Sequence, residues 1–484
     1  MSPFARQSVY KIGRVTVVMV AAGLLSTPAQ AQEAPAASSP AEVAPVPSAP
    51  SPAAVPVAEP ASQSRLDALE QRTRLLEINL AAAQAAATSP RSTTTFQTDE
   101  GGFAVTSADR QYQLRFKGVL QVDGRRIFDN TPLQNSVDTF IVRRARPIIA
   151  GTLLGLTDFM FVPDFGNNTV ALFDAYADTH PFPWLRLRVG KFKGPVGLER
   201  LQSDTDLVFG ERALSQNLSP QREVGIELWG DIAGGLVHYE AGVFNGNPDN
   251  GNNDIDSDHA KTFEGRLVLQ PFSLPSLHGL GRLLVGVAAS RGNELGTPTN
   301  PWLGAFKSFS QSTIFSYLSS STANTVFAKG RHTRVNPQLY YYFGPFGLLA
   351  EWVHEYQQLA NSVGSGAVNN SAGNVEASFV IGGDETYEGV KPHHSLDLAA
   401  GGYGALEIAV RYNWLHIDPA AFPTAANPQT SVNQARAFGV ALAWQLSRNL
   451  RAAADYEQTW FDGGAKTGNR TTEKMGIARF QVAF

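Results

Sequence analysis

Basic side chains two residues apart recur in the first half of the chain, and these are the residues whose types and spacing suit a chemical task. Residues two apart on a β-strand share a face, so each pair would point in one direction. The arginine guanidinium group is a planar fork that matches phosphate oxygens, whereas the lysine ammonium group acts as a point charge. Gathered on one wall of a narrow channel, such groups would concentrate anions through a focused positive field. The candidates for this anion path are Arg115, Lys117, Arg125, Arg144, Arg146, Arg186 and Arg188.

Alternating stretches of sequence position these side chains. In residues 111–125 one face carries apolar residues from Tyr112 to Val122, and the other carries polar residues, with Val119 as the exception. The same period of two recurs in 185–192, 405–414 and 438–445, and it is the signature of a β-strand with two different faces. An arginine or lysine facing lipid at mid-bilayer costs about 2–4 kcal/mol. The alternation therefore assigns the basic residues to an inner face.

Sixteen segments between 112 and 484 read as strands, and the weakest is 374–381, because the adjacent stretch HHSLDLAA also alternates. Short turns such as 181–184 and 344–347 alternate with long polar loops such as 194–221 and 292–330. No run of eighteen apolar residues is present, and a sheet survives in lipid only when it is closed. The pattern predicts an all-β fold, a 16-stranded antiparallel transmembrane β-barrel over 110–484. Expected girdle aromatics are Tyr340, Tyr341, Tyr342, Tyr412, Trp414 and Trp444.

The loop 194–221 is too polar and irregular for a strand, and loops of this length are usually functional or disordered. Folded into the lumen, it would narrow the pore and set its selectivity. Its basic candidates are Lys193, Arg200, Arg212 and Arg222.

Acidic residues in the same region leave the net charge of the lumen open. The arginines are either bare or neutralised by these acids, and the sequence does not choose between the two. The acids are Asp123, Asp164, Asp174 and Asp178 among the early strands, with Glu223, Glu227, Glu240, Glu264, Glu351, Glu407, Asp455 and Glu457 later.

The start of the chain has the form of a secretory signal peptide at 1–31. A basic segment is followed by a short apolar run and by the small residues AQA at 29–31, which predicts cleavage after Ala31 rather than an uncleaved anchor. Cleavage removes three basic residues and leaves 36 basic and 43 acidic residues, a net charge of −7. Such a charge argues against nucleic-acid binding. The absence of cysteine excludes disulfides and thiolate metal sites.

Two segments separate the signal peptide from the barrel. Residues 32–63 are rich in proline, alanine and serine and read as an extended or disordered linker. Residues 64–88 carry apolar residues at spacings of three and four, which is a short heptad seam. We expect either an oligomerising coiled-coil stalk or a single amphipathic helix.

The chain ends on RFQVAF, a strand with two faces. Phe480, Val482 and Phe484 are expected to face lipid, while Arg479 and Gln481 face the lumen. A bare terminal phenylalanine resembles the signal by which outer-membrane barrels are recognised for insertion. The partner implied by this resemblance is the barrel-assembly machinery.

The chain resembles a known family, the phosphate-selective porins O and P of Gram-negative outer membranes. The resemblance rests on FIVRRARPIIAGTL, VGKFKGPVGLERLQSDTDLVFGERAL, LSPQREVGIELWGD, GVFNGN, YEGVKP and GALEIAVRYNWLHI, in family order. It implies a sixteen-stranded barrel, a homotrimer, anion uptake along an arginine and lysine ladder, and constriction by the 194–221 loop. It also implies that the helical stalk is periplasmic. The expected function is passive diffusion of small inorganic anions, phosphate or polyphosphate, and the alternative is a general or differently selective porin.

Other classes of function fit less well. An outer-membrane enzyme would need a nucleophile beside a base, yet His238, His332, His354, His393, His394 and His416 lie in no recognisable nucleophile motif. An active transporter would need a folded plug before the barrel. A purely structural protein that links the membrane to the cell wall would use only the helical stalk. No metal or nucleotide motif is present in the sequence, so we expect no cofactor.

Overall fold

The computed structural model describes residues 69–81, 94–99, 101–128, 137–256, 258–272, 279–319 and 324–484. The predicted signal peptide at 1–31 and linker at 32–63 lie outside these residues, as do 64–68 and 82–88 of the predicted helical segment. Residues 69–81 are helical, and all of their side chains are exposed within the single chain. None of the described helices has the length and apolar character needed to cross a membrane.

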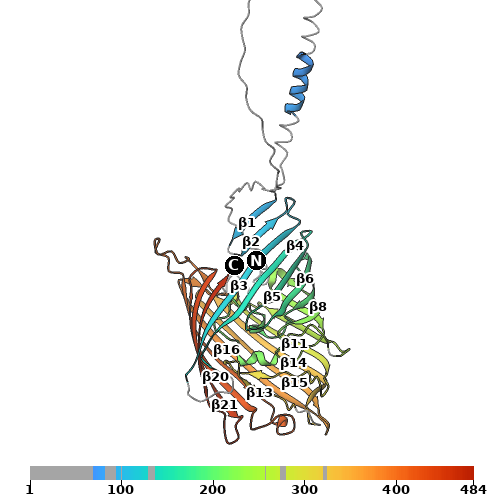
Figure 1. The fold of residues 1–484 in the computed structure, drawn as a ribbon, viewed down its shortest axis with the longest axis vertical. Helices are drawn as coiled ribbons and strands as arrows, with labels where there is room; N and C mark the ends of the chain where they lie inside the picture. Colours follow the sequence, from blue (N-terminus) through green and yellow to red (C-terminus); the bar gives the residue numbers. More distant parts are fainter. Residues whose placement is uncertain are drawn as a thin grey trace, which may run out of the picture. The chain divides into compact units, whose positions relative to one another are not determined.

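Sixteen strands form one antiparallel sheet in which successive strands pair (Figure 1). They are β3 Gln113–Ile127, β4 Thr139–Leu153, β5 Thr157–Asp164, β6 Ala171–Phe182, β7 Leu185–Phe192, β8 Glu223–Ile232, β9 Val237–Phe244, β10 Thr262–Leu269, β11 Leu283–Leu295, β14 Phe327–Phe343, β15 Phe346–Ala360, β16 Ser365–Ile381, β19 Ala405–His416, β20 Val432–Gln445, β21 Leu450–Gly463 and β22 Glu473–Ala483. The last strand pairs with the first, from Met475 opposite Ile127 to Ala483 opposite Val119. This pairing closes the barrel, so the predicted fold is confirmed.

All sixteen predicted segments overlap a barrel strand. The least certain segment, 374–381, is the second half of β16, which begins nine residues earlier at Ser365. The first half reads SGAVNNSAG, and such small and polar residues carry little apolar alternation. The competing stretch HHSLDLAA lies outside the strands.

Further short elements accompany the barrel. The hairpin of β1 and β2 pairs with the start of β3, beside the end of β22. These elements are β1 Thr95–Asp99, β2 Gly102–Thr106, β12 Phe306–Lys307, β13 Thr313–Phe315, β17 Gly383–Asp384 and β18 Lys391–Pro392, with helices α2 Leu198–Leu201, η1 Leu214–Leu218, η2 Ala233–Gly235, η4 Leu280–Arg282 and η5 Pro419–Ala421.

The two faces of the barrel wall differ as the alternation predicts. Leu120 on the outer face is 43% exposed, whereas its neighbour Gln121 on the inner face is fully buried. A broad exposed apolar surface is unfavourable in water and suits lipid. Two expectations are wrong: Tyr340 and Tyr342 face inward, where both pack with Tyr387, so neither is a girdle residue.

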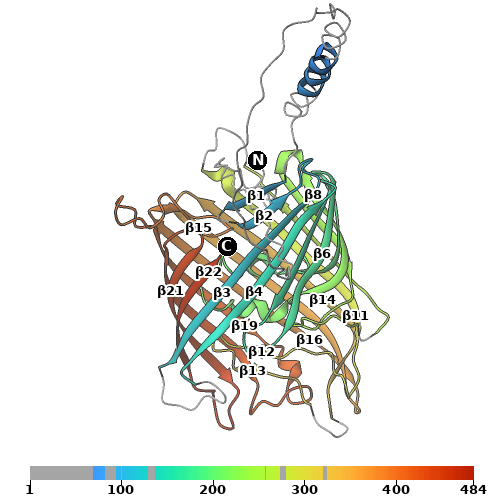
Figure 2. The ribbon, with the colours of Figure 1, turned by 45° about the horizontal axis from the view of Figure 1, so that its top comes forward.

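The connections separate onto two rims, as Figure 2 shows. The short-turn rim carries the predicted tight turns, the start of β3 and the end of β22. The long-loop rim carries the predicted loops 194–221, 246–258, 292–330 and 417–431. One long connection, 382–404, lies on the short-turn rim instead, where β17 and β18 form a small hairpin.

The terminal phenylalanine lies at the seam where the barrel closes. The amide N–H of Phe484 donates to the Gly118 carbonyl oxygen at 3.0 Å, and the Gly118 amide donates back at 2.9 Å. A Cβ atom on Gly118 would lie 2.6 Å from the Phe484 ring, so a larger residue at 118 would displace this ring. Phe103 of β2 packs edge-on against the same ring.

Candidate functional site: the lumenal constriction

The segment 194–221 lies inside the lumen and contacts much of the barrel wall. Its short helix α2 begins against Glu351 of β15, whose carboxylate accepts from the Leu198 amide at 2.7 Å and the Glu199 amide at 3.3 Å. A carboxylate suits this place because the first amides of a helix lack partners within the helix. On the η1 side, Ser215 donates to Asn374 of β16 at 2.8 Å.

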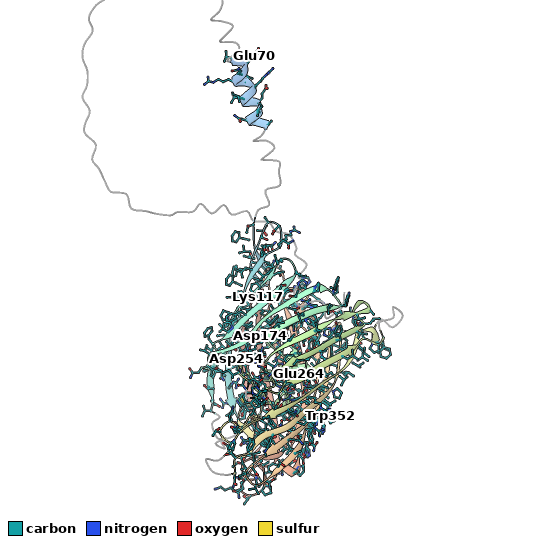
Figure 3. The ribbon with its side chains drawn as sticks, turned by 90° about the vertical axis from the view of Figure 1, so that its right-hand side faces the viewer. Glu70, Lys117, Asp174, Asp254, Glu264 and Trp352 are labelled. Carbon is teal, nitrogen blue, oxygen red and sulfur yellow. The ribbon has the colours of Figure 1, made fainter. Side chains whose placement is uncertain are left out.

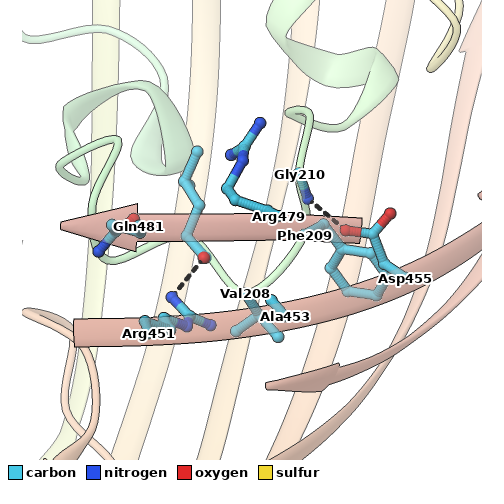
Figure 4. Close-up of a pocket in the computed structure, with 9 residues that line it drawn as sticks. Val208, Phe209, Gly210, Arg451, Ala453, Asp455, Arg479 and Gln481 are labelled. Carbon is cyan, nitrogen blue, oxygen red and sulfur yellow. Dashed lines mark hydrogen bonds between the residues drawn. The ribbon is translucent and has the colours of Figure 1, made fainter. Parts of the chain in front are cut away.

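The middle of the segment contacts another part of the wall, where β21 and β22 lie (Figure 4). The Gly210 amide donates to the Asp455 carboxylate at 2.6 Å. Arg451 donates to the Leu207 carbonyl oxygen at 2.8 Å, and Gln481 donates to the Thr205 carbonyl oxygen at 3.0 Å. The segment is therefore attached at several points around the lumen and narrows it.

Two acidic residues of this segment bind the basic wall made by β3 and β4. Glu211 accepts from Arg143 through both oxygens, at 2.6 and 2.9 Å, and it also pairs with Arg125. Burial alone would raise the pKa of Glu211, but the charges of Arg143 and Arg125 hold it well below its ordinary value. Glu211 thus remains a carboxylate inside the lumen.

Asp204 occupies the centre of the second group. Its carboxylate pairs with Arg212 at 2.8 Å, with Arg144 at 3.3 Å and with Arg146. Arg146 also bonds Asp164 at 2.6 Å. Asp204 and Asp164 supply two carboxylates to three guanidinium groups, so this part of the lumen stays positive.

Most of the predicted basic residues have an acidic partner. Arg188 pairs with Asp178 at 2.8 Å, and Arg186 pairs with the same carboxylate at 3.2 Å. The remaining pairs among the predicted residues are Arg115 with Asp99 at 3.1 Å, Arg125 with Asp123 at 3.0 Å, and Arg222 with Asp174 at 3.4 Å. The arginine ladder is neutralised along much of its length, which settles the alternative that the sequence left open.

Three predicted residues, Lys117, Lys193 and Arg200, have no acidic side chain at ion-pair distance within the part of the chain that the structure describes. Lys193 donates to the Gln202 carbonyl oxygen at 2.8 Å, and Arg200 donates to the Gln216 carbonyl oxygen at 2.7 Å. Burial lowers the pKa of Lys193 well below its ordinary value, and the charges of Arg212 and Arg222 lower it further.

We call Lys193, Arg200, Arg212 and Arg222 the Lys193 cluster. Asp204 and Asp174 act on Lys193, and Glu199 acts on Arg200, so four basic groups stand against three carboxylates. The sequence predicted these four residues for the loop, and the structure brings them together. Their shared field favours a bound anion.

The comparison with protein families decides what kind of protein this is. The model of the family described as phosphate-selective porin O and P matches residues 115–484. The chain belongs to the phosphate-selective porin O and P family. It is therefore a porin, a protein of the outer membrane of Gram-negative bacteria.

The fold of this porin is similar to that of a solved outer-membrane channel. The outer membrane channel DcaP of Acinetobacter baumannii is 9% identical, with a TM-score of 0.51, and the match covers 79% of this chain and all of that chain. OmpT of Vibrio cholerae is 10% identical (TM-score 0.49; 77% and 98% covered), and an anion-selective porin from Comamonas acidovorans is 11% identical (0.45; 77% and 100%). At such identities the likeness concerns the fold alone. No curated protein sequence matches this porin.

Several lumenal residues of this porin were missed from the sequence. The pairing of Gln121 with Arg144 and of Val122 with Val142 leaves Arg143 in a β-bulge, so Arg143 and Arg144 both face inward although they are neighbours. A second bulge at Phe173 turns its ring into the lumen, between Arg146 at 4.3 Å and Arg222 at 4.4 Å from the ring centre. Strict alternation sends Arg143 and Phe173 outward, and no signal in the sequence marks either bulge.

The later acids mostly hold other parts of the lumen. Glu457 binds Arg411 at 2.7 Å, and Glu407 binds Arg451 at 3.0 Å. Glu227 is a further partner of Arg188 at 3.3 Å. These acids pair with arginines outside the Lys193 cluster.

Proposed function

We propose that this porin passes small inorganic anions by passive diffusion, with phosphate as the preferred ion. The observation that carries the proposal is the positive excess of the Lys193 cluster within the constricting 194–221 segment. Low-dielectric walls focus the field of such a cluster and raise the local anion concentration. An anion beside Lys193 would also stabilise its charged form, which burial and two guanidinium groups disfavour.

Lys117 extends the proposed path toward the short-turn rim. Figure 3 shows Lys117 nearer that rim, with Asp174 and Glu264 deeper along the barrel. Arg115, two residues away, is partly exposed together with its partner Asp99. We infer that an anion meets this pair of cations at one end of the lumen and the Lys193 cluster at the constriction.

The preference for phosphate follows from the donors of the cluster. Guanidinium groups bind phosphate oxygens through two parallel hydrogen bonds, which chloride cannot accept in the same way. The Nε–H group of Arg200 is buried without a hydrogen-bond partner among the described residues. An unpaired buried donor is costly, and an oxyanion would satisfy it.

A general diffusion porin is the second candidate, and one observation favours it. Eight of the eleven predicted basic residues pair with acids. If those pairs dominate the field along the path, anions and cations would pass with similar ease.

The phosphate proposal predicts that phosphate blocks chloride current in single pores and that Lys193→Gln weakens the block. Losing one charge-assisted hydrogen bond of about 1.5–3 kcal/mol raises the half-blocking phosphate concentration roughly ten-fold to a hundred-fold. The measurement is chloride current in a planar bilayer during phosphate titration. Lys261→Gln, which removes the same charge from an exposed loop pair with Asp256, should match the unmodified pore. An equal block in all three proteins would contradict the proposal.

Three further expectations belong to the assembly of this porin. We propose a homotrimer, with the helix at 69–81 as part of a periplasmic coiled-coil stalk. We also propose that the terminal strand, through Phe480, Val482 and Phe484, is recognised by the barrel-assembly machinery. The exposure of Phe480 and Phe484 on the outer face, 50% and 42%, supports this second proposal.

A further inference from the structure

A buried group of one histidine and three carboxylates lies in the half of the barrel near the long-loop rim. His332 comes from β14, Glu355 from β15, Glu294 from the end of β11, and Asp249 from the loop between β9 and β10. One ligand atom each from Asp249, His332 and Glu355 lies within 4.8 Å of the others. Each of these three side chains is at most 5% exposed.

The hydrogen bonds of His332 resemble those of a metal ligand. Nδ1 lies 2.7 Å from Glu294 Oε1, and Nε2 lies 2.8 Å from Glu355 Oε1. With its proton on Nδ1, the ring donates to Glu294 and turns the Nε2 lone pair toward Glu355. A histidine that binds a metal usually donates its other N–H to a carboxylate in this way, which fixes the tautomer and raises ligand basicity.

Glu294 gives a second and independent indication of a missing cation. It is 2% exposed, and its Oε2 atom is buried with no hydrogen-bond partner among the described residues. Glu294 lines the same cavity as Asp249, His332 and Glu355. An unpaired buried carboxylate oxygen is expensive unless a proton or a cation satisfies it.

The surrounding charges do not neutralise the group. Arg334 is the nearby cation, and its Nε and Nη2 atoms both donate to Oδ1 of Asp249, at 3.1 and 2.8 Å. Asp249 also forms a side-chain hydrogen bond with Glu355, and such close contact between two carboxyl groups requires a proton or a cation. Three carboxyl groups therefore share one guanidinium group and one imidazole, and a divalent cation would offset their charge in place of bound protons.

We propose that Asp249, His332 and Glu355 bind one divalent transition-metal ion, with Glu294 orienting His332. One imidazole with carboxylates suits Zn²⁺ and its neighbours in the first transition row better than Mg²⁺ or Ca²⁺, which prefer oxygen alone. Binding replaces any proton on Nε2, which passes to solvent. The ion would tie the loop at 245–261 to β14 and β15, beneath Trp302 and Tyr317, which line the same cavity. This site is separate from the Lys193 cluster and does not depend on anion transport.

The test is titration of the folded full-length porin in detergent micelles with Zn²⁺, followed by calorimetry and by metal analysis after dialysis. We expect one Zn²⁺ per chain and a higher thermal midpoint in its presence. His332→Gln and Glu355→Gln should abolish both effects, and Glu294→Gln should weaken affinity roughly 10–100-fold. Mg²⁺ should not compete.

The matched control is His238→Gln. His238 also lies between two carboxylates, Asp231 at 2.9 Å and Glu240 at 2.8 Å, but it is the second residue of β9, at the short-turn rim. This variant should bind Zn²⁺ like the unmodified protein. The proposal is overturned if the unmodified protein retains no Zn²⁺, if a folded His332→Gln or Glu355→Gln variant binds equally well, or if Mg²⁺ displaces the ion.

Discussion

Glu211 illustrates how single residues hold the lumen of this porin together. Its carboxylate is 3% exposed and bonds Arg125 and Arg143 at once. A buried ion pair adds little net stability, because desolvation offsets its attraction, but removal of one partner strands the other as an unpaired charge. Loss of Glu211 would therefore cost more stability, through the unpaired arginine charge that remains, than its ion pairs contribute.

Glu211→Gln should lower the free energy of unfolding by about 3–5 kcal/mol, because Arg143 loses its carboxylate and Arg125 loses one of two. Urea unfolding in detergent micelles, followed by tryptophan fluorescence, measures the change. Asp256→Asn breaks the partly exposed pair with Lys261 and should cost at most about 1 kcal/mol. A loss in Glu211→Gln no larger than in Asp256→Asn would refute this assignment.

The residues that face the lumen could be predicted more easily than the residues with which they form ion pairs. The i, i+2 spacing placed Arg115, Lys117 and the other wall residues inward without knowledge of the fold. It could not place Asp204 or Glu211, because an irregular loop has no period. It also could not join Asp249 to His332, since 83 positions separate them and the successive pairing of β9, β10, β11 and β14 brings them together.

At the scale of elements, the period of two was sufficient to predict a strand wherever one face of that strand contacts lipid. Strands such as β19 and β20 carry large apolar residues on most outward positions, from Leu406 to Trp414 and from Phe438 to Trp444, so their register is strongly specified. The first half of β16 was missed because Gly, Asn and Ser supply no such contrast. The β1–β2 hairpin was missed for another reason: its two five-residue strands are too short to show a period.

The helix at 69–81 presents leucines that nothing in the described part of the chain covers. Leu69, Leu76 and Leu80 are 60%, 67% and 59% exposed, and they lie on the predicted heptad seam. A helix this short is marginal alone. We infer that copies of the helix pack together along this seam.

Replacing both Leu69 and Leu76 by Asp should weaken the trimer, because buried carboxylates would face one another across the seam. The measurement is the trimer fraction on analytical ultracentrifugation in detergent across a dilution series. Gln71→Asp adds one carboxylate away from the seam and should leave the trimer intact. Equal trimer fractions in the two variants would leave the helix without an oligomerising role.

At the scale of the whole molecule, net charge and local charge have opposite signs. The chain carries 39 basic and 43 acidic residues, yet the Lys193 cluster is positive within the narrowed lumen. A permeating ion is influenced most by the charges nearest to it, because salt screens the distant and exposed ones beyond about 10 Å. Selectivity should therefore follow the constriction and not the overall balance.

The most direct test of this account is the zero-current potential of the unmodified porin in a planar bilayer that separates two concentrations of KCl. If the constriction is positive, chloride carries most of the current, and the zero-current potential has the sign set by the chloride gradient. The potential should be smaller at high salt, where the cluster is screened. A potential near zero, or one of the sign set by potassium, would contradict it.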